Sequence, residues 1–281
     1  MSFLDRISEC PAPDLSACRS FKVDGLDLGW VKADFAQSLG EFTDVFRVTD
    51  GSVELAEGLK GFDSRTGAID GALRVLAGRG VIKDWRDEFF PVGESFAEPA
   101  LFNMDRSAVP LFGVWAYGVH VNGYIEDGDG LKMWIGRRSL DKPTAPGKLD
   151  QIVAGGQPAG ISLKENLIKE CQEEASIPSD VVNRAVPVGG ISYATERPEG
   201  LRRDVLFNYD LELPSDFQPV NTDGEIAEFY LWPIERVMEV VRDTDEFKFN
   251  CAMVVIDFLI RRGYIEPDHP QYVELLSGLH R

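Results

Sequence analysis

The chain has 281 residues, enough for one large domain or two ordinary ones, and its 44% hydrophobic and 27% charged residues are typical of globular proteins. Its formal net charge of −18 argues against a general nucleic-acid or anionic-membrane surface, because such a surface needs a basic patch. An anionic small molecule is still compatible, since a metal ion or a few arginines can reverse the field inside one pocket.

The first part of the chain, residues 1–108, predicts a small accessory domain of mixed α and β structure. Residues 26–42 predict a strand followed by a helix, and the Asp50–Gly51 pair between two short apolar runs predicts a hairpin. Residues 65–82 predict a helix that ends at a glycine. Its expected apolar set is Leu73, Val75, Leu76 and Val81. This region contains no motif that carries chemistry.

From residue 109 onward, predicted strands outnumber predicted helices. The expected strands are a long hairpin at 111–139, a strand at 149–156 that enters a glycine turn, a pair at 186–214 and a strand at 226–233. The expected helices after them lie at 233–241 and 250–265. The pattern favours an α+β sandwich over a regular βαβ repeat.

Cysteine usage and the termini indicate a reducing compartment. The four cysteines form no CxxC pair and no cluster with zinc spacing, and Cys171 and Cys251 lie in apolar helical patterns that predict buried free thiols. The N-terminus has no basic segment followed by an apolar one, and no apolar run approaches the ~20 residues of a membrane span. We therefore expect a soluble, cytoplasmic protein without membrane partners.

A helix is predicted to begin near Leu163, after a glycine-rich turn. Ser162 and Glu165 have the spacing of a capping box, in which the hydroxyl and the carboxylate each accept a backbone N–H. Glu165 thus has a structural role and is left out of the chemistry. Pro178 ends the helix just past Ile177.

Three carboxylates share one face of this predicted helix. Glu170, Glu173 and Glu174 are spaced i, i+3 and i+4, and they border the apolar stripe of the helix. Partly desolvated carboxylates raise one another's pKa values unless a cation neutralises them, and Mg²⁺ prefers such oxygen ligands. The glycines at 155–160 can bring backbone carbonyls close to a metal. A solvated acidic helix face is the alternative interpretation.

The segment from Gly155 to Ile177 resembles the motif of the Nudix hydrolases, G-x5-E-x7-R-E-U-x-E-E-x-G-U, where U is an aliphatic residue. The three helix glutamates fall on the glutamates in the second half of this motif. The departures are Ile161 at the first glutamate, Lys169 at the arginine and Ser176 at the late glycine. Lys169 can pair with a glutamate as a point charge, whereas Ile161 removes one acid and weakens the expected metal binding.

The resemblance implies an α/β/α sandwich with a mixed β-sheet over residues 109–281, preceded by the smaller α+β domain over 1–108. It implies hydrolysis of a diphosphate linked to an organic group, with Mg²⁺, or alternatively Mn²⁺, as cofactor. The implied metal ligands are Gly155, Glu170, Glu173 and Glu174. The implied catalytic residues are Glu173, Glu174 and Glu225, the last from a loop ahead of a strand that ends in Trp-Pro. Glu228 is the nearby alternative to Glu225.

A narrower resemblance spans nearly the whole chain. The stretches "GRRS", "AGGQPAG", "KECQEEAS", "DLELP" and "DGEIAEF" are similar to the Nudix branch related to thiamine pyrophosphokinase. This implies thiamine diphosphate, or its damaged oxo and oxy analogues, as substrate and a monophosphate as product. The alternatives are another nucleoside or prenyl diphosphate, an isomerase of the same fold, or a non-catalytic diphosphate-binding module because of Ile161. A homodimer stays open.

Several side chains are candidates for contacting this small-molecule substrate. The preferred cations for the phosphates are Arg137, Arg138 and Arg203, with Arg197 and Arg202 as further candidates. Tyr193, with Trp115 and Tyr117 as alternatives, is expected to contact an organic ring. Solvated arginine pairs and core aromatics are the competing interpretations, and His120 is expected to be a hydrogen-bonded strand histidine without a role in the chemistry.

Overall fold

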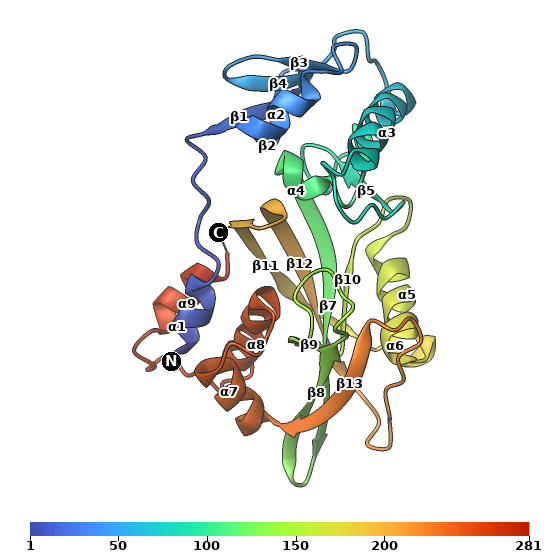
Figure 1. Cartoon of the computed structure of the whole chain (residues 1–281). Helices are drawn as coiled ribbons and strands as arrows, with labels where there is room; N and C mark the ends of the chain where they lie inside the picture. The colour runs from blue at the N-terminus through green and yellow to red at the C-terminus, as the bar shows by residue number, and fades with distance from the viewer. Residues whose placement is uncertain (281) are drawn as a thin grey trace.

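The computed structural model describes residues 1–280, which form three β-sheets surrounded by helices (Figure 1). A four-stranded sheet and a two-stranded hairpin belong to the first part of the chain, and a seven-stranded sheet belongs to the second. Within these 280 residues, none of the helices combines the length and apolar character that a membrane crossing requires.

The four-stranded sheet has the order β2-β1-β4-β3, with β1 and β4 parallel and the other neighbours antiparallel. Its elements are β1 (Cys18–Val23), β2 (Leu26–Lys32), α2 (Ala33–Leu39), β3 (Phe46–Val48), β4 (Ser52–Leu55) and α3 (Phe62–Gly78). The predicted hairpin around Asp50 and Gly51 is confirmed by β3 and β4, and β2 and α2 confirm the predicted strand and helix. A hairpin of β5 (Phe89–Val92) and β6 (Phe102–Asp105) follows, and then α4 (Val109–Phe112).

Helix α3 buries a different face from the one predicted. Ile69, Leu73 and Leu76, spaced i, i+4 and i+7, are fully buried in the core of the N-terminal region. Val75 lies off this face and is 43% exposed, and Val81 follows the end of the helix and is 41% exposed. The prediction that both valines belong to the apolar face is therefore wrong.

The seven-stranded sheet is mixed. Its main path has the order β11-β12-β7-β8-β13, while β10 pairs with β7 and β9 with β8. Strands β12 and β7 are parallel, and the other neighbours are antiparallel. The strands are β7 (Trp115–Asp127), β8 (Gly130–Arg138), β9 (Leu149–Gln151), β10 (Val153–Gly156), β11 (Val186–Arg197), β12 (Gly200–Glu212) and β13 (Ile226–Pro233). Strands β7 and β8 confirm the predicted long hairpin.

The predicted strand over 149–156 is instead two short strands. The chain leaves β8 after β9 and joins β7 at β10, so the pairing partner changes at Ile152, which is fully buried. This change of partner places the glycine turn that follows β10 beside β7.

Helices cover both faces of the seven-stranded sheet (Figure 1). Helices α5 (Leu163–Ala175) and α6 (Ser179–Val182) share one core with β7 and β10, whereas α7 (Ile234–Asp243) and α8 (Phe249–Arg261) share another core with β7 and β8. The predicted α/β/α sandwich with a mixed sheet is thus confirmed. Cys171 and Cys251 are buried free thiols in these two cores, as predicted.

The first residues of the chain depart from the predicted division at residue 108. Helix α1 (Phe3–Ser8) lies against α7, α8 and α9 (Tyr272–Gly278), and Phe3 and Ile7 belong to the core around α8 (Figure 1). Arg6 Nη1 also donates to the Thr244 carbonyl at 2.6 Å. Apolar burial therefore assigns α1 to the C-terminal unit, and the rest of the division stays a prediction.

Candidate active site

Helix α5 begins as the sequence predicts. The Glu165 N–H donates to Ser162 Oγ at 3.2 Å, and the Ser162 N–H donates to Glu165 Oε2 at 2.7 Å, which completes the capping box. The helix ends at Ser176, whose φ of 52° is the left-handed conformation that favours glycine. Ser176 Oγ donates to the Val220 carbonyl at 2.7 Å, so the serine ties the end of α5 to a later loop.

Gly155 lies close to the side chain of Glu170. A Cβ at Gly155 would lie 2.2 Å from Glu170 Cδ and 2.4 Å from Oε2, so any other residue there would force the Glu170 carboxylate to move. Glu170 is 8% exposed, and burial raises the pKa of its carboxyl, although the neighbouring Lys169 lowers it. The backbone at Gly155 and the carboxylate of Glu170 therefore lie close together.

Glu174 is the most buried carboxylate of the helix face. It is 4% exposed, and its Oε2 accepts the Ala154 N–H at 2.8 Å. Burial, and then the charge of Glu170, raise the pKa of Glu174 well above its usual range. Without a cation, the fold therefore favours the protonated form of this group.

The loop before β13 is attached to the last turn of α5. The Thr222 N–H and Oγ1 donate to the Glu173 carbonyl at 3.0 and 2.7 Å, and Asn221 Nδ2 donates to the Glu174 carbonyl at 3.2 Å. These are carbonyls that the end of a helix leaves without intrahelical partners. Satisfying them places residues 221–225 directly beside the carboxylate face.

This attachment brings Asp223 and Glu225 to Glu174. The three side chains offer ligand oxygens that all lie within 4.8 Å of one another. Asp223 Oδ1 accepts the Glu225 N–H at 2.8 Å, so the turn aims both carboxylates together. Asp223 was not predicted from the sequence, although its position two residues before Glu225 in "TDGEI" was a usable signal. Glu228 instead accepts the Tyr230 hydroxyl at 2.5 Å and lies outside this cluster.

Glu173 and Lys169 lie at the more exposed side of the face. Lys169 Nζ is 2.8 Å from Glu173 Oε2 and 3.1 Å from Glu170 Oε1, so the lysine pairs with two of the glutamates, as a point charge can. Ile161 does not line the cavity that these acids face, and its carbonyl accepts Gln157 Nε2 at 2.8 Å. The position that lost its glutamate thus has a backbone role in the turn.

The donor set fits a hard divalent cation. Glu170, Glu174, Asp223 and Glu225 together offer only oxygen atoms, and the Gly155 backbone lies against them. Such oxygen-rich sites suit Mg²⁺ or Mn²⁺ rather than softer metals. The acids also exceed the two lysines that contact them, Lys142 beside Glu225 and Lys169 beside Glu170 and Glu173.

A cavity of about 420 Å³ opens beside the acids. Its walls contain the acids that α5 and the 221–225 loop contribute. They also contain cations from several elements. These cations are Arg86, Arg106, Arg138, Lys142, Lys169, Arg202 and Lys248. A cavity that combines an acid cluster with several cations is suited to a metal-bound anion.

The predicted substrate arginines have different environments. Arg138 lines the cavity, is 7% exposed and donates from Nη1 to Asp150 Oδ2 at 2.7 Å. Arg137 does not line the cavity, because its Nη2 donates to Glu246 at 3.1 Å and its Nη1 to the Gly147 carbonyl at 2.9 Å. Alternation along β8 places the two arginines on opposite faces of the sheet, so a substrate contact by Arg137 is not supported.

Arg203 and Tyr193 also differ from expectation. Arg203 lines a smaller cavity of about 150 Å³, where its guanidinium lies 4.3 Å from the Trp30 ring centroid and 4.1 Å from that of Trp115. Tyr193 is fully buried, and its hydroxyl donates to Asp204 and accepts from Asn250. Direct contact of Tyr193 with a substrate is therefore not supported, because no part of its ring reaches the cavity.

Among the remaining candidates, Arg202 and Tyr117 line the main cavity. Arg202 is held by Asp204 through an Nη2–Oδ2 distance of 2.9 Å. Tyr117 lies with Phe96 and Phe207 in an aromatic cluster, with ring centroids 4.7 Å apart for Tyr117 and Phe96. Arg197 instead donates to the Glu9 carbonyl at 2.7 Å and does not line the cavity.

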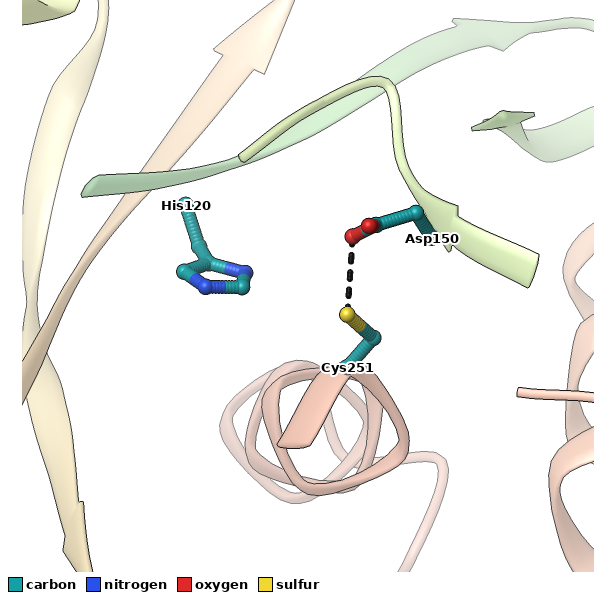
Figure 2. Close-up of side chains that lie close together, drawn as sticks. All are labelled: His120, Asp150 and Cys251. Carbon is teal, nitrogen blue, oxygen red and sulfur yellow. Dashed lines mark hydrogen bonds between the residues drawn. The ribbon is translucent and has the colours of Figure 1, made fainter. Parts of the chain in front are cut away.

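A second cluster consists of His120, Asp150 and Cys251 (Figure 2), of which His120 also lines the cavity. Cys251 Sγ donates to Asp150 Oδ1 at 2.7 Å, and His120 Nδ1 is 2.7 Å from Gln151 Oε1. Burial lowers the pKa of His120 to about 4, so the ring is neutral at pH 7. Because Gln151 Nε2 donates to the Cys251 carbonyl, its Oε1 accepts from His120, as the expected hydrogen-bonded histidine requires.

Asp150 in this second cluster is already neutralised by cations. Burial raises its pKa, but Lys248 and Arg138 outweigh that effect and lower it to about 2. Burial raises the pKa of Cys251 well above its usual range, so the thiol keeps its proton. The three side chains meet the distance requirement for a metal site, yet their charge is balanced without one.

Several known proteins are similar to this chain. A family model described as a domain of unknown function, DUF4743, matches residues 2–116. Nudix hydrolase 24, chloroplastic, and Nudix hydrolase 20, chloroplastic, both from Arabidopsis thaliana, are 44% and 42% identical to the chain. Each alignment covers 99% of this chain and 77% of the relative. Among solved structures, the MutT protein from Methanosarcina mazei Go1 is similar to this chain, with 19% sequence identity and a TM-score of 0.39. The superposition covers 54% of this chain and 96% of the MutT chain.

Proposed function

The chain belongs to the Nudix hydrolase family, and we propose that it uses a divalent metal ion to hydrolyse a diphosphate linked to an organic group. The observation that carries the proposal is the meeting of Glu174, Asp223 and Glu225 within 4.8 Å, on the wall of a cavity that also holds cations. Glu170 and the Gly155 backbone adjoin this group of oxygen donors.

When bound, Mg²⁺ or Mn²⁺ neutralises the phosphate charge and lowers the pKa of the attacking water. Glu170, Glu174 and the Gly155 carbonyl, with the acids of the 221–225 loop, would hold the ion. Burial raises the pKa of Glu225, but the hydrogen bond and charge of Lys142, together with the charges of Arg106 and Arg138, lower it below its usual value, so this carboxylate is ionised at neutral pH. Glu225 is therefore suited to accept a proton from water, with the more exposed Glu173 as the second candidate.

We propose thiamine diphosphate or its oxidised analogues as substrate, with the monophosphate as product. The support is the resemblance to the thiamine pyrophosphokinase-related branch, which spans nearly the whole chain. Tyr117 on the cavity wall adds an aromatic surface against which a heteroaromatic ring can pack. A thiazolium ring would also gain a cation–π contact there.

The non-catalytic alternative rested on Ile161. The structure offers acids that do not depend on that position, because Asp223 and Glu225 reach Glu174 from a separate loop. A module that only bound a diphosphate would need cations but no such group of acids. Hydrolysis is therefore the better-supported function.

A substrate panel tests the proposal. Oxothiamine, oxythiamine and thiamine diphosphates are assayed beside nucleoside and prenyl diphosphates, with and without Mg²⁺, and kcat/KM is compared. We expect Mg²⁺-dependent monophosphate release, fastest with a thiamine analogue. Faster turnover of a nucleoside or prenyl diphosphate would reassign the substrate, and ligand binding without turnover under any divalent metal would contradict hydrolysis.

Cellular location and assembly stay predictions. The sequence analysis expected a cytoplasmic protein and left a homodimer open, and the two plant relatives carry names that place them in the chloroplast.

A further inference from the structure

The β5–β6 hairpin of the N-terminal region is attached to the glycine turn of the site. The Ala159 N–H donates to the Phe89 carbonyl at 2.8 Å. The Phe90 ring lies against Gly156, where a Cβ would come within 2.5 Å of Phe90 Cζ. The absence of a side chain at Gly156 therefore lets the hairpin pack directly on the turn that also contacts Glu170.

This packing brings two arginines to the cavity. Arg86 precedes β5 and Arg106 follows β6, and both line the main cavity as well as the smaller one beside it. The two cavities also share Phe90 and Arg202 in their walls, so they lie next to each other. The family model that matches residues 2–116 covers the whole hairpin.

Arg106 lines the same cavity as the acids Glu174 and Glu225. Its Nη1 donates to Glu88 at 2.6 Å, and its guanidinium lies 5.3 Å from the Phe90 ring centroid. These two contacts hold the arginine at the wall of the cavity that the acid cluster also lines.

Arg86 is a cation on this cavity with no acidic partner. Over residues 1–280, its guanidinium forms no hydrogen bond or ion pair with another side chain. In a chain with a net charge of −18, most arginines find a carboxylate, and a cation that faces a cavity without one can receive an external anion.

We propose that the β5–β6 hairpin is part of the active site and that Arg86 and Arg106 bind phosphate oxygens of the diphosphate substrate. This inference rests on the proposed function and adds a role for the N-terminal region. The acid cluster holds the metal, whereas the hairpin supplies charge directly to the phosphates. Substrate recognition is thereby divided between the two parts of the chain.

The test uses the full chain and methylenediphosphonate, a diphosphate analogue that is not hydrolysed. Its affinity in the presence of Mg²⁺ is measured by calorimetry, and Mn²⁺ affinity without the analogue is measured by electron paramagnetic resonance. We expect Arg86→Ala and Arg106→Ala each to weaken diphosphonate binding by about tenfold, the size of one charge-assisted contact, with Mn²⁺ affinity within about twofold of wild type.

Arg79→Ala is the matched control. Arg79 belongs to the same region and pairs with Glu41 at 2.6 Å, but it lines neither cavity. The double variant Glu88→Gln/Arg106→Ala removes the pair without changing the net charge, so it separates loss of a phosphate contact from the release of Glu88. We expect this variant, too, to bind the diphosphonate about tenfold more weakly.

The outcomes separate this inference from the proposed function. If wild type binds Mn²⁺ and the diphosphonate, and all hairpin variants bind the diphosphonate as tightly as Arg79→Ala, the hairpin inference is overturned and the proposed function stands. If wild type binds neither, the proposed function fails and this inference falls with it.

Discussion

Within residues 1–280, two groups of side chains bring their donor atoms close enough together to hold a metal ion, and only one of them has the charge of a metal site. Glu174, Asp223 and Glu225 converge as carboxylates on an open cavity. His120, Asp150 and Cys251 converge as a buried group, but Arg138 and Lys248 neutralise the one acid of that group. Proximity of donor atoms is therefore insufficient, because uncompensated negative charge is what a hard cation requires.

The largest expected effect is a loss of folding stability when the acid of the second group, Asp150, is replaced. Asp150→Asn leaves the Arg138 guanidinium buried without its counter-charge, and we expect unfolding to become easier by about 3–5 kcal/mol. Chemical denaturation at pH 7 measures this change. A loss below about 1 kcal/mol would mean that Lys248 and solvent, rather than the Arg138 pair, control the stability of this cluster.

The next effect concerns activity. We expect Glu174→Gln to lower kcat/KM by more than about a hundredfold, because it removes a ligand from the acid cluster, while the protein stays folded. Glu173→Gln is expected to act in the same direction. Glu165→Gln serves as the matched control, since that residue belongs to the capping box of the same helix. Full activity in both Glu173→Gln and Glu174→Gln would contradict the metal-site assignment.

A pH prediction follows from the raised pKa of Glu174. When the pKa of a carboxyl is higher in the folded state than in the unfolded state, the folded state binds the proton more tightly. The resulting stabilisation is fully present at a pH below the unfolded-state pKa, near 4.5 for Glu174. It is lost as the pH rises through the higher folded-state pKa. We therefore expect the Tm of the metal-free protein in EDTA to fall as the pH rises above the usual glutamate value of 4.5. Mg²⁺ should restore more stability at pH 8 than at pH 5.

Glu174→Gln is also the control for this pH series. Asp150 remains ionised over the whole range because its pKa is about 2, so it adds no slope. In this variant, we expect Tm to decrease less with rising pH than in wild type, and Mg²⁺ to raise Tm by a smaller amount. An unchanged slope would assign the pH dependence to the general repulsion within an acidic chain.

The smallest effect concerns the second cluster. Cys251→Ser keeps a donor to Asp150, and we expect a stability change below about 1.5 kcal/mol and no change in Mn²⁺ or Zn²⁺ affinity. Calorimetric metal titration of the variant beside wild type measures both metals. Loss of a Zn²⁺ site in the variant would show that the thiol cluster binds metal after all.

The cluster around Glu174 was partly predictable because its helix members are local. The spacing of Glu170, Glu173 and Glu174 depends only on helical geometry, and Ser162 and Glu165 mark where that helix begins. Asp223 was missed because its place depends on hydrogen bonds between a loop and the carbonyls of α5, roughly fifty residues away. Arg137 and Tyr193 were selected by residue type, which does not determine the direction of a side chain.

By itself, the sequence determined the capped helix with its acidic face and the long hairpin of β7 and β8, because these depend on short-range backbone geometry and periodicity. Only the tertiary structure decided that the 221–225 loop joins this face and that α1 packs on α7 to α9. It also decided that the β5–β6 hairpin supplies a wall of the cavity. Such contacts join residues that are far apart in the chain. They form because the complete fold buries apolar side chains and satisfies backbone hydrogen bonds there.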